Sequence, residues 1–348
     1  MPAQSLLQRQ LPPFRSREEM VDLLLTQEYG LMPQIPYTME VSEPKVVDKR
    51  YCCGNAQYSF VNMTITTEYG SHTFRVNRLL HTDGKEHPFF VFINFTPAVP
   101  DKYLPAEEIM ENGFSMLSFC YSDVTADNGD FTDGLAKCLL PNGQDTPTAC
   151  GKLMIWAWAA MRVMDYAQTL SGLNFQQAAL VGHSRLGKTA LLGSMLDKRF
   201  RYAISNDSGC GGAALTRGKN GESIADILNK FYYWFCPRFK DFADHYPPDF
   251  DQHYLLSSIA PRYVYVCSAS MDDWADPDSE FLNCIAASEE FKRQGLPGFI
   301  CDNAFPGDDV TYHEGTIGYH RRPGMHFLSR HDWHRFMAFI RLHSKDEQ

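Results

Sequence analysis

The segment from Ala179 to Thr189 restricts the possible folds of this chain more than any other feature. A short apolar run ends at Gly182, Ser184 follows within a tight turn, and a helix-prone run begins directly afterwards. This order predicts a strand, a sharp turn and a helix, with Ser184 at the bend. The chemistry of the bend depends on which residues the rest of the chain supplies.

Two kinds of chemistry fit this bend, and an ordinary strand-to-helix turn is the third possibility. Residues 182–189 match the phosphate-loop pattern G-x-x-x-x-G-K-[ST], in which Lys188 would contact the terminal phosphates of a nucleotide. The nucleophile-elbow pattern G-x-S-x-G fits less well, because its second glycine comes one place late, at Gly187. An elbow would present the Ser184 hydroxyl to a histidine from elsewhere in the chain. The pattern alone leaves these alternatives open.

Length and composition are those of a large globular protein. The chain has 348 residues, of which 44% are hydrophobic, enough for one large α/β domain or two smaller ones. The formal net charge is −10 and no basic stripe occurs, so we expect no nucleic-acid partner. No apolar run is long enough to span a bilayer, so we expect no membrane partner. The first residues also lack a signal-peptide pattern, which favours a cytoplasmic location.

Cysteine and aspartate spacing argues against a metal site. The ten cysteines are scattered and include no C-x-x-C pair, so we expect them to be mostly reduced and structural. Aspartates at positions 123, 127, 130 and 133 do not have EF-hand spacing, which needs a glycine at the sixth place and a glutamate at the twelfth. We therefore interpret residues 121–150 as a polar excursion above the sheet, where functional loops usually lie.

The order of apolar runs predicts a single α/β domain. Residues 1–57 form an N-terminal arm with a short amphipathic helix from Arg17 to Tyr29, and residues 58–348 form the catalytic core. Alternation from Tyr58 to Leu80 indicates antiparallel strands with one face in water. From Pro88 onward, fully apolar runs alternate with helix-prone segments, which is typical of a parallel sheet covered by helices.

The chain order of the reactive residues favours a hydrolase over a nucleotide-binding protein. An α/β hydrolase needs a nucleophile, an acid and a histidine in that order, each on a loop after a strand. Ser184, Asp272 and His326 meet this requirement. A phosphate loop usually follows the first strand of its domain, whereas several strands precede this one. The backbone N–H of Arg185, directly after the nucleophile, would serve an oxyanion hole.

With these motifs established, the chain resembles the glucuronoyl esterase family (carbohydrate esterase family 15), especially its bacterial branch. The family's elbow G-x-S-R-x-G-K matches residues 182–188, which accounts for both the late glycine and the phosphate-loop match. The other similar stretches are residues 156–158, 207–212, 251–253, 259–262, 272–277, 317–320 and 324–326. The resemblance implies an α/β-hydrolase fold with an N-terminal β-rich extension, and it implies ester hydrolysis.

The resemblance also implies roles for individual residues. Ser184 would be the nucleophile and His326 the general base. Arg185 would stabilise the oxyanion, Lys188 would contact a sugar hydroxyl, and Trp274 would line the sugar site. No metal or cofactor is required. The glutamine and glutamate with which fungal members hold uronate hydroxyls have no clear match between residues 220 and 230.

Alternatives remain for several of these roles. Asp272 is the favoured acid, but some members place a glutamate where this chain has Asp207, which makes Asp207 the alternative acid. Further alternatives are Asp273 and Asp276 for the acid, and His313, His320, His331 and His334 for the base. Purely structural roles also stay open: a solvated Lys188, a buried Trp274, and an Asp207 that caps a loop.

The sequence therefore predicts a serine carboxylic-ester hydrolase that acts on a small carbohydrate ester by two-step acyl transfer. A glucuronoyl ester and an acetylated sugar are the leading substrates. The alternatives from other classes are a catalytically silent sugar-binding relative and a nucleotide-binding protein. The sequence gives no indication of the oligomeric state.

Overall fold

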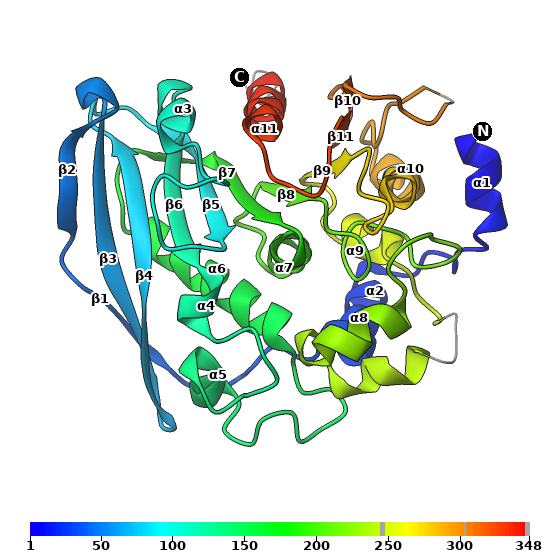
Figure 1. Ribbon diagram of the computed structural model, residues 1–348, viewed down its shortest axis with the longest axis horizontal. Coiled ribbons are helices and arrows are strands. Elements are labelled where there is room, and N and C mark those ends of the chain that lie inside the picture. Colours follow the sequence, from blue (N-terminus) through cyan, green and yellow to red (C-terminus); the bar gives the residue numbers. More distant parts are fainter. Residues whose placement is uncertain (244–247, 303, 345–348) are drawn as a thin grey trace.

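One mixed sheet passes through the whole protein. The computed structural model describes residues 1–243, 248–302 and 304–344. In this part of the chain the sheet has eleven strands in the order β1-β3-β4-β6-β5-β7-β8-β9-β11-β10, with β2 paired to β3 (Figure 1). The strands are β1 (Thr38–Val41), β2 (Lys45–Tyr51), β3 (Ala56–Thr67), β4 (Gly70–His81), β5 (His87–Asn94), β6 (Ser115–Cys120), β7 (Leu173–His183), β8 (Tyr202–Asn206), β9 (Tyr263–Ala269), β10 (Val310–Tyr312) and β11 (Ile317–Arg322).

The sheet has a parallel centre and antiparallel ends. Strands β6, β5, β7, β8, β9 and β11 run parallel to their neighbours in that row. Strands β1 to β4 pair antiparallel, β4 joins β6 antiparallel, and β10 closes the far edge antiparallel to β11. The predicted parallel sheet preceded by antiparallel strands is therefore confirmed. Because parallel strands end at the same edge, the loops after β7, β8, β9 and β11 meet there.

Helices cover both faces of the parallel strands. The helices of the described residues are α1 (Pro2–Gln8), α2 (Arg17–Leu24), α3 (Ala106–Glu111), α4 (Tyr121–Val124), α5 (Gly134–Leu139), α6 (Lys152–Ala167), α7 (Arg185–Leu196), α8 (Ile224–Phe231), α9 (His253–Ser257), α10 (Pro277–Arg293) and α11 (Arg330–His343). Figure 1 shows α3 and α11 on one side of the sheet and α6 and α7 on the other. No helix within the three described ranges is long and apolar enough to cross a membrane.

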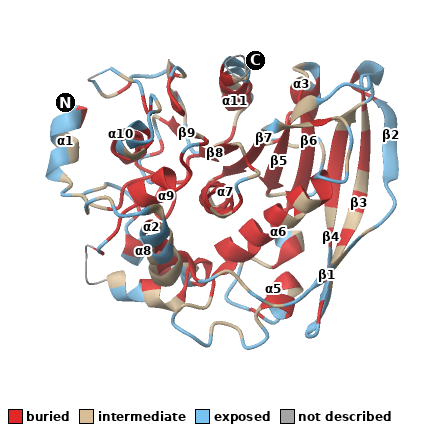
Figure 2. Ribbon diagram, turned by 180° about the vertical axis from the view of Figure 1, so that it is seen from behind, coloured by how far each residue is buried: buried red, intermediate tan, exposed pale blue. Residues whose placement is uncertain are grey.

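The apolar runs of the central strands follow from this double cover. In β5, Phe89 and Val91 belong to the core formed with α6, α7 and α10, whereas Phe90 and Phe92 belong to the core formed with α3 and α11. Successive side chains of a strand point to opposite faces, so a strand covered on both sides is apolar at every position. The central strands are accordingly mostly buried, while β2 at the margin is exposed (Figure 2).

The N-terminal arm contains more regular structure than its sequence indicates. The α-helix predicted from Arg17 to Tyr29 ends at Leu24, and a π turn covers Leu25–Tyr29. The strands β1 and β2 and the helix α1 were not predicted. Almost every residue of β2 is exposed, so its sequence carries no alternation between apolar and polar residues. The excursion at residues 121–150, predicted as loop, includes the short helices α4 and α5.

A buried polar network connects the N-terminal arm to the segment between β8 and β9. Glu28, at the π turn, is fully buried, and Gln252 Nε2 donates to both of its carboxylate oxygens at 2.9 Å. The Tyr29 hydroxyl donates to the Gly211 carbonyl at 3.0 Å. Burial raises the pKa of Glu28 to about 8, a larger effect than the opposing hydrogen bond from Gln252. The carboxyl group is therefore neutral in the folded protein at pH 7.

Replacing Glu28 by glutamine should flatten the dependence of stability on pH. The folded protein keeps the Glu28 proton up to about pH 8, whereas the unfolded chain releases it near the ordinary pKa of 4.5. Folding therefore binds a proton between these values, and the stability that this group contributes is lost as the pH rises through that window. The melting temperature of Glu28→Gln should fall less than that of the wild type between pH 5 and pH 8. Glu18→Gln, on the exposed side of α2, is the matched control, and identical slopes for all three proteins would contradict the prediction.

Candidate active site

Ser184 alone makes the turn between β7 and α7. The strand ends at His183 and the helix begins at Arg185, so Ser184 adopts φ 58° and ψ −127°. A residue other than glycine rarely adopts this conformation, which occurs mainly at functional sites. Ser184 N–H donates to the Asn206 carbonyl at 2.8 Å, which fixes the turn to the end of β8. The serine side chain is thereby held at the edge of the sheet.

Two glycines make this turn sterically possible. A Cβ atom at Gly182 would lie 1.9 Å from the Leu186 carbonyl oxygen, so the first turn of α7 packs directly on the strand backbone. A Cβ atom at Gly187 would lie 3.0 Å from both Ser205 Oγ and Ser208 Cβ. The second glycine of the motif is therefore needed where α7 crosses the end of β8, one position later than in the G-x-S-x-G pattern.

The alternative of a phosphate loop is wrong. Residues 184–187 form a one-residue turn and the first turn of a helix, with no open loop that could surround a phosphate. Lys188 is 4% exposed, and its ammonium group donates to the Cys210 carbonyl at 2.6 Å and also to the Ser208 carbonyl. A nucleotide would have to displace both of these internal hydrogen bonds.

Ser184 opens into a cavity of about 340 Å³ at the shared end of the parallel strands. Asp272 reaches it from the loop after β9 and His326 from the loop after β11, so residues far apart in the chain meet there. The residues that line the cavity are Ser184, Arg185, Lys188, Asp207, Ser208, Gly209, Glu222, Phe231, Trp234, Asp272, Trp274, Ala275 and His326. Every residue assigned to the site from the sequence is among them.

The imidazole of His326 is oriented by Asp272. The distance from His326 Nδ1 to Asp272 Oδ2 is 2.6 Å. The aspartate side chain is 6% exposed and the histidine side chain 43%. A carboxylate that accepts a hydrogen bond from Nδ1 leaves Nε2 without a proton, and Nε2 is then free to act as a base. This pair is the contact expected of the acid and base of a serine hydrolase.

A second histidine lies beside this pair but has a different environment. The rings of His183 and His326 are 4.6 Å apart between centroids. Burial lowers the pKa of His183 to about 3, with a smaller contribution from His326 in the same direction. His183 is therefore neutral and places no positive charge next to His326.

Asp207, the alternative acid, bonds the loops that carry the other two groups. Its Oδ1 accepts the Ala269 N–H at 2.7 Å, and its Oδ2 accepts the Phe327 N–H at 3.3 Å. It is 1% exposed, and burial raises its pKa well above the ordinary value despite the nearby Arg322. These bonds fit the loop-capping role. Asp207 also lies close to the pair, because one oxygen of each carboxylate and one His326 nitrogen are within 4.8 Å of one another.

Arg322, at the end of β11, holds the loop that carries His326. Its guanidinium donates to the Pro323 carbonyl at 3.2 Å, to the Met325 carbonyl at 3.0 Å and to the Phe327 carbonyl. Its Nε also donates to both oxygens of Asp332, at 3.1 and 3.0 Å. The sequence did not indicate a role for this residue. Its only signal there is an arginine four residues before His326.

Arg185 offers two kinds of donor beside Ser184. As the first residue of α7, its backbone N–H has no acceptor within the helix, and it is therefore available to an oxyanion. Its guanidinium lies 4.7 Å from the centroid of the Trp234 ring and forms an ion pair with Asp127. The side chain is thus fixed in the cavity wall.

Trp274 and Glu222 form a bonded pair in the cavity wall. Trp274 is 50% exposed and lines the cavity, so the alternative of a Trp274 buried in the core is wrong. Its Nε1 donates to Glu222 Oε1 at 3.1 Å. Glu222 lies in the segment of residues 220–230, where the sequence shows no clear match to the glutamine and glutamate of the fungal members. Lys188 is buried, so the alternative of a solvated lysine at the helix start is also wrong.

The further alternatives for the acid and the base, Asp207 apart, lie outside the cavity. Asp276 caps α10 by accepting the Ser279 N–H at 3.1 Å, and Asp273 is exposed. The remaining histidines have other partners: His313 and His320 bond the Tyr265 hydroxyl, His331 lies near Asp309, and His334 bonds Glu108. None of these six residues lines the Ser184 cavity.

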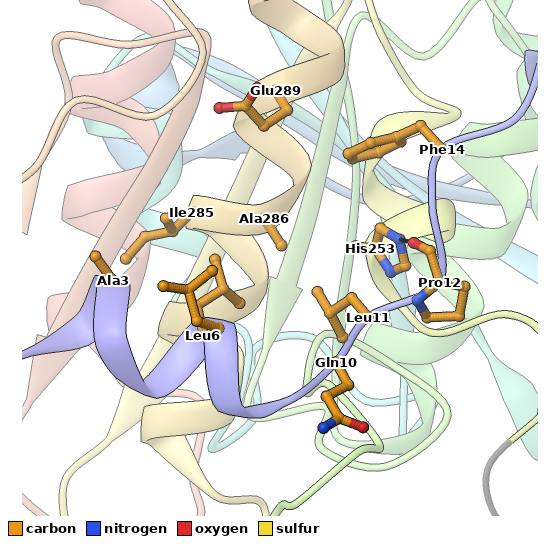
Figure 3. A pocket seen from close by; sticks show the side chains of 11 residues that line it. Ala3, Leu6, Gln10, Leu11, Pro12, Phe14, His253, Ile285, Ala286 and Glu289 are labelled. Carbon is orange, nitrogen blue, oxygen red and sulfur yellow. Dashed lines mark hydrogen bonds between the residues drawn. The ribbon is translucent and has the colours of Figure 1, made fainter.

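A larger cavity, of about 550 Å³, lies between α1 and α10 (Figure 3). Leu6, Leu11, Phe14 and Ile285 make it mainly apolar. His253 is its one imidazole, with Nε2 at 3.1 Å from the Pro12 carbonyl, and burial lowers its pKa to about 4. The residues that line this cavity include no serine or cysteine nucleophile. The smaller cavity is therefore the candidate active site.

In the described part of the chain, two groups of side chains bring metal-ligand donors together, but both are already bonded internally. They are Asp207 with Asp272 and His326, and Cys267 with His320 and Asp332. The Arg322 guanidinium bonds one carboxylate of each group, Asp207 at 3.3 Å and Asp332 at 3.0 Å. A cation in either group would lie beside this fixed positive charge, so we assign a metal to neither.

Comparison with known proteins identifies the family. The family model described as glucuronyl esterase of fungi matches residues 63–295. The chain belongs to the glucuronyl esterase family. A carbohydrate esterase from an unknown prokaryotic organism is 35% identical over 240 residues, which cover 68% of this chain and 55% of that protein. A 4-O-methyl-glucuronoyl methylesterase of Hypocrea jecorina is 26% identical over 254 residues, which cover 67% of this chain and 53% of that protein. The chain thus spans about half the length of the curated relatives it matches.

Solved structures of family members have the same fold. A promiscuous CE15 esterase from a marine bacterial metagenome is 28% identical, with a TM-score of 0.82, and the match covers 94% of this chain and 91% of that one. A glucuronoyl esterase from Solibacter usitatus is 27% identical, with a TM-score of 0.85, and the match covers 94% and 92%. The predicted α/β-hydrolase fold with an N-terminal β-rich extension and the predicted family are both confirmed.

A methyl group at Gly182 should disrupt the turn on which the site depends. Its Cβ would approach the Leu186 carbonyl to 1.9 Å, a backbone atom that cannot move without shifting α7. We expect Gly182→Ala to lose about 3 kcal/mol of unfolding free energy, measured in urea. Gly307→Ala is the control, because a Cβ there would meet nothing within 4 Å. A Gly182→Ala variant as stable as the control would show that the helix does not pack on the strand in this way.

Proposed function

We propose that this protein hydrolyses a carboxylic ester of a carbohydrate, with Ser184 as nucleophile, His326 as general base and Asp272 as acid. The observation that carries the proposal is the 2.6 Å contact between His326 Nδ1 and Asp272 in the cavity that Ser184 enters from a strained turn. Family membership supports the reaction class. Asp272 is preferred to Asp207 because it contacts the imidazole directly, whereas Asp207 bonds backbone N–H groups.

In the first step, Ser184 attacks the ester carbonyl. A serine hydroxyl is a weak nucleophile at neutral pH, so His326 Nε2 takes its proton as the new bond forms. Asp272 holds the imidazole in the required tautomer and stabilises the imidazolium. The Arg185 N–H stabilises the negative charge that develops on the carbonyl oxygen, and loss of one such donor typically costs about 3–4 kcal/mol. The imidazolium then protonates the departing alcohol.

In the second step, water releases the acyl group. His326 accepts a proton from the water as it attacks the acyl-serine, and the same donors stabilise the second oxyanion. Ser184 then recovers its proton from the imidazolium. The chain's own groups supply each proton transfer in this scheme.

Polar groups around the cavity suit a sugar. Lys188 has one ammonium proton beyond the two that bond the Ser208 and Cys210 carbonyls, and Glu222 offers a carboxylate. Trp274 offers a half-exposed ring of the kind that packs on pyranose faces. Relatives are named as 4-O-methyl-glucuronoyl methylesterases, and a solved relative as a glucuronoyl esterase. We therefore propose a glucuronoyl ester as the substrate class, ahead of an acetylated sugar.

A cytoplasmic location remains part of the proposal. All ten cysteines are free thiols, eight of them buried, which fits a reducing compartment. Cell fractionation would test this location.

Removing the Ser184 hydroxyl should abolish the activity. We expect Ser184→Ala to lower kcat for a small aryl acetate by about 10⁵-fold or more, because the nucleophile and base act as a unit. Ser71→Ala, at an exposed position near the start of β4, should keep wild-type kinetics. If Ser184→Ala kept the full rate, the proposal would fail. A wild-type protein that binds saccharides but reacts with no fluorophosphonate probe would instead be a catalytically silent relative.

Replacing Glu222 should separate sugar recognition from ester chemistry. We expect Glu222→Gln to raise KM for methyl glucuronate about tenfold, because a charged hydrogen-bond acceptor for sugar hydroxyls is lost. The kinetics with an aryl acetate, which has no sugar, should change little. The measurement compares methyl glucuronate, acetylated xylo-oligosaccharides and aryl esters. Equal changes in KM for all three would argue against a sugar-binding role, and a preference for acetylated sugars would change the substrate class.

A further inference from the structure

The polar excursion at residues 121–150 brings one aspartate to the wall of the active site. Asp127 lies after α4, and its Oδ2 accepts hydrogen bonds from the Arg185 guanidinium and, at 3.2 Å, from the Tyr121 hydroxyl. Its Oδ1 accepts from Trp234 Nε1 at 2.7 Å and from the Tyr233 hydroxyl at 3.2 Å. Both carboxylate oxygens are therefore engaged, and the side chain is 13% exposed.

Asp127 bonds both the guanidinium of Arg185 and the indole on which that guanidinium lies. The guanidinium is 4.7 Å from the Trp234 ring centroid and 5.2 Å from that of Phe231. These two rings stack on each other, with centroids 4.0 Å apart and planes at 4°. The carboxylate thus connects the cation to its aromatic support. Such an arrangement leaves the guanidinium little freedom to rotate.

The other aspartates of the excursion have different partners. Asp133 accepts the Ala126 N–H at 2.8 Å and pairs with Lys152 at 3.1 Å, which shapes the loop itself. Asp130 accepts the Thr132 N–H at 2.8 Å on the exposed side. Among the described residues of the excursion, Asp127 is the aspartate that contacts a residue lining the Ser184 cavity.

We propose that Asp127 is a positioning residue that holds the Arg185 guanidinium beside the oxyanion site of Ser184. The inference rests on the esterase function proposed above. An arginine side chain has many rotamers, and donors stabilise a transition state well only when they are already in place before the reaction. Asp127 supplies this fixation, and Tyr121 and Trp234 in turn fix Asp127. Burial raises the pKa of Tyr121 to about 12, so its hydroxyl remains a donor to the carboxylate at neutral pH.

A double-mutant cycle tests whether Asp127 acts through Arg185. Asp127→Asn keeps the size of the side chain but removes its charge. We expect it to lower kcat for an aryl ester about 10–100-fold with KM changed less than about twofold, because a misplaced donor affects the transition state more than the ground state. In an Arg185→Ala background, the same substitution should cost less than about threefold. Asp130→Asn is the matched control in the same excursion and should have no effect in either background.

The rate of phosphonylation by a fluorophosphonate provides a second readout, because the reagent needs the same nucleophile and oxyanion donors but no sugar or ester. It should decrease in parallel with kcat in Asp127→Asn. If thermal unfolding shows that this variant does not fold, Tyr121→Phe replaces it, because this substitution removes one donor to Asp127. It should slow phosphonylation about threefold in protein that retains Arg185, and it should have no effect in the Arg185→Ala background.

The outcomes separate this inference from the proposed function. An unchanged kcat and phosphonylation rate in folded Asp127→Asn, or an equal loss with and without Arg185, would overturn the positioning role. A wild-type protein that is phosphonylated but hydrolyses no ester would overturn the proposed function. The double-mutant cycle, measured with phosphonylation rates in place of kcat, would then still decide the role of Asp127. A wild-type protein that does neither would overturn both.

Discussion

The left-handed backbone conformation of Ser184 is the constraint on which the rest of the site depends. A positive φ at a serine is unfavourable by itself, so the surrounding structure must stabilise it. The Ser184 N–H is fixed to the Asn206 carbonyl, and the absence of side chains at Gly182 and Gly187 lets α7 start directly above the strands. The same turn places the Arg185 N–H at a helix N-terminus, where it has no helical acceptor. Nucleophile and oxyanion donor are therefore set by one local geometry.

A separate set of contacts holds the His326 imidazole. These contacts fix the loops that follow β9 and β11, at the same edge of the sheet as Ser184. Arg322 binds three carbonyls of the His326 loop and the carboxylate of Asp332, while Asp207 binds the loops after β9 and β11. These charged groups are buried, which is favourable only because almost every donor and acceptor is paired. The loop after β11 is thereby as well defined as the turn at Ser184. Proton transfer between Ser184 and His326 needs both the fixed turn at Ser184 and the fixed loop after β11.

Much of this arrangement could be predicted from the sequence because it depends on chain order. The carboxyl ends of parallel strands meet at one edge, so Ser184, Asp272 and His326, each following a strand, were expected to converge. Arg322, Glu222 and Asp127 could not be predicted in the same way. Glu222 acts through Trp274 and Asp127 through Arg185, and both partners are distant in the sequence. Arg322 acts mainly through backbone carbonyls of its own loop, which no pattern of side chains indicates. Likewise, the burial of Lys188 depends on the loop after β8, which no local pattern reveals.

The most direct test of the central claim is peptide mass spectrometry of the protein after reaction with a fluorophosphonate. If the strained turn presents an activated hydroxyl to His326, a single phosphonyl adduct should form on Ser184, and it should be lost in His326→Ala. An adduct on a different residue, or undiminished labelling of Ser184 without His326, would contradict the account.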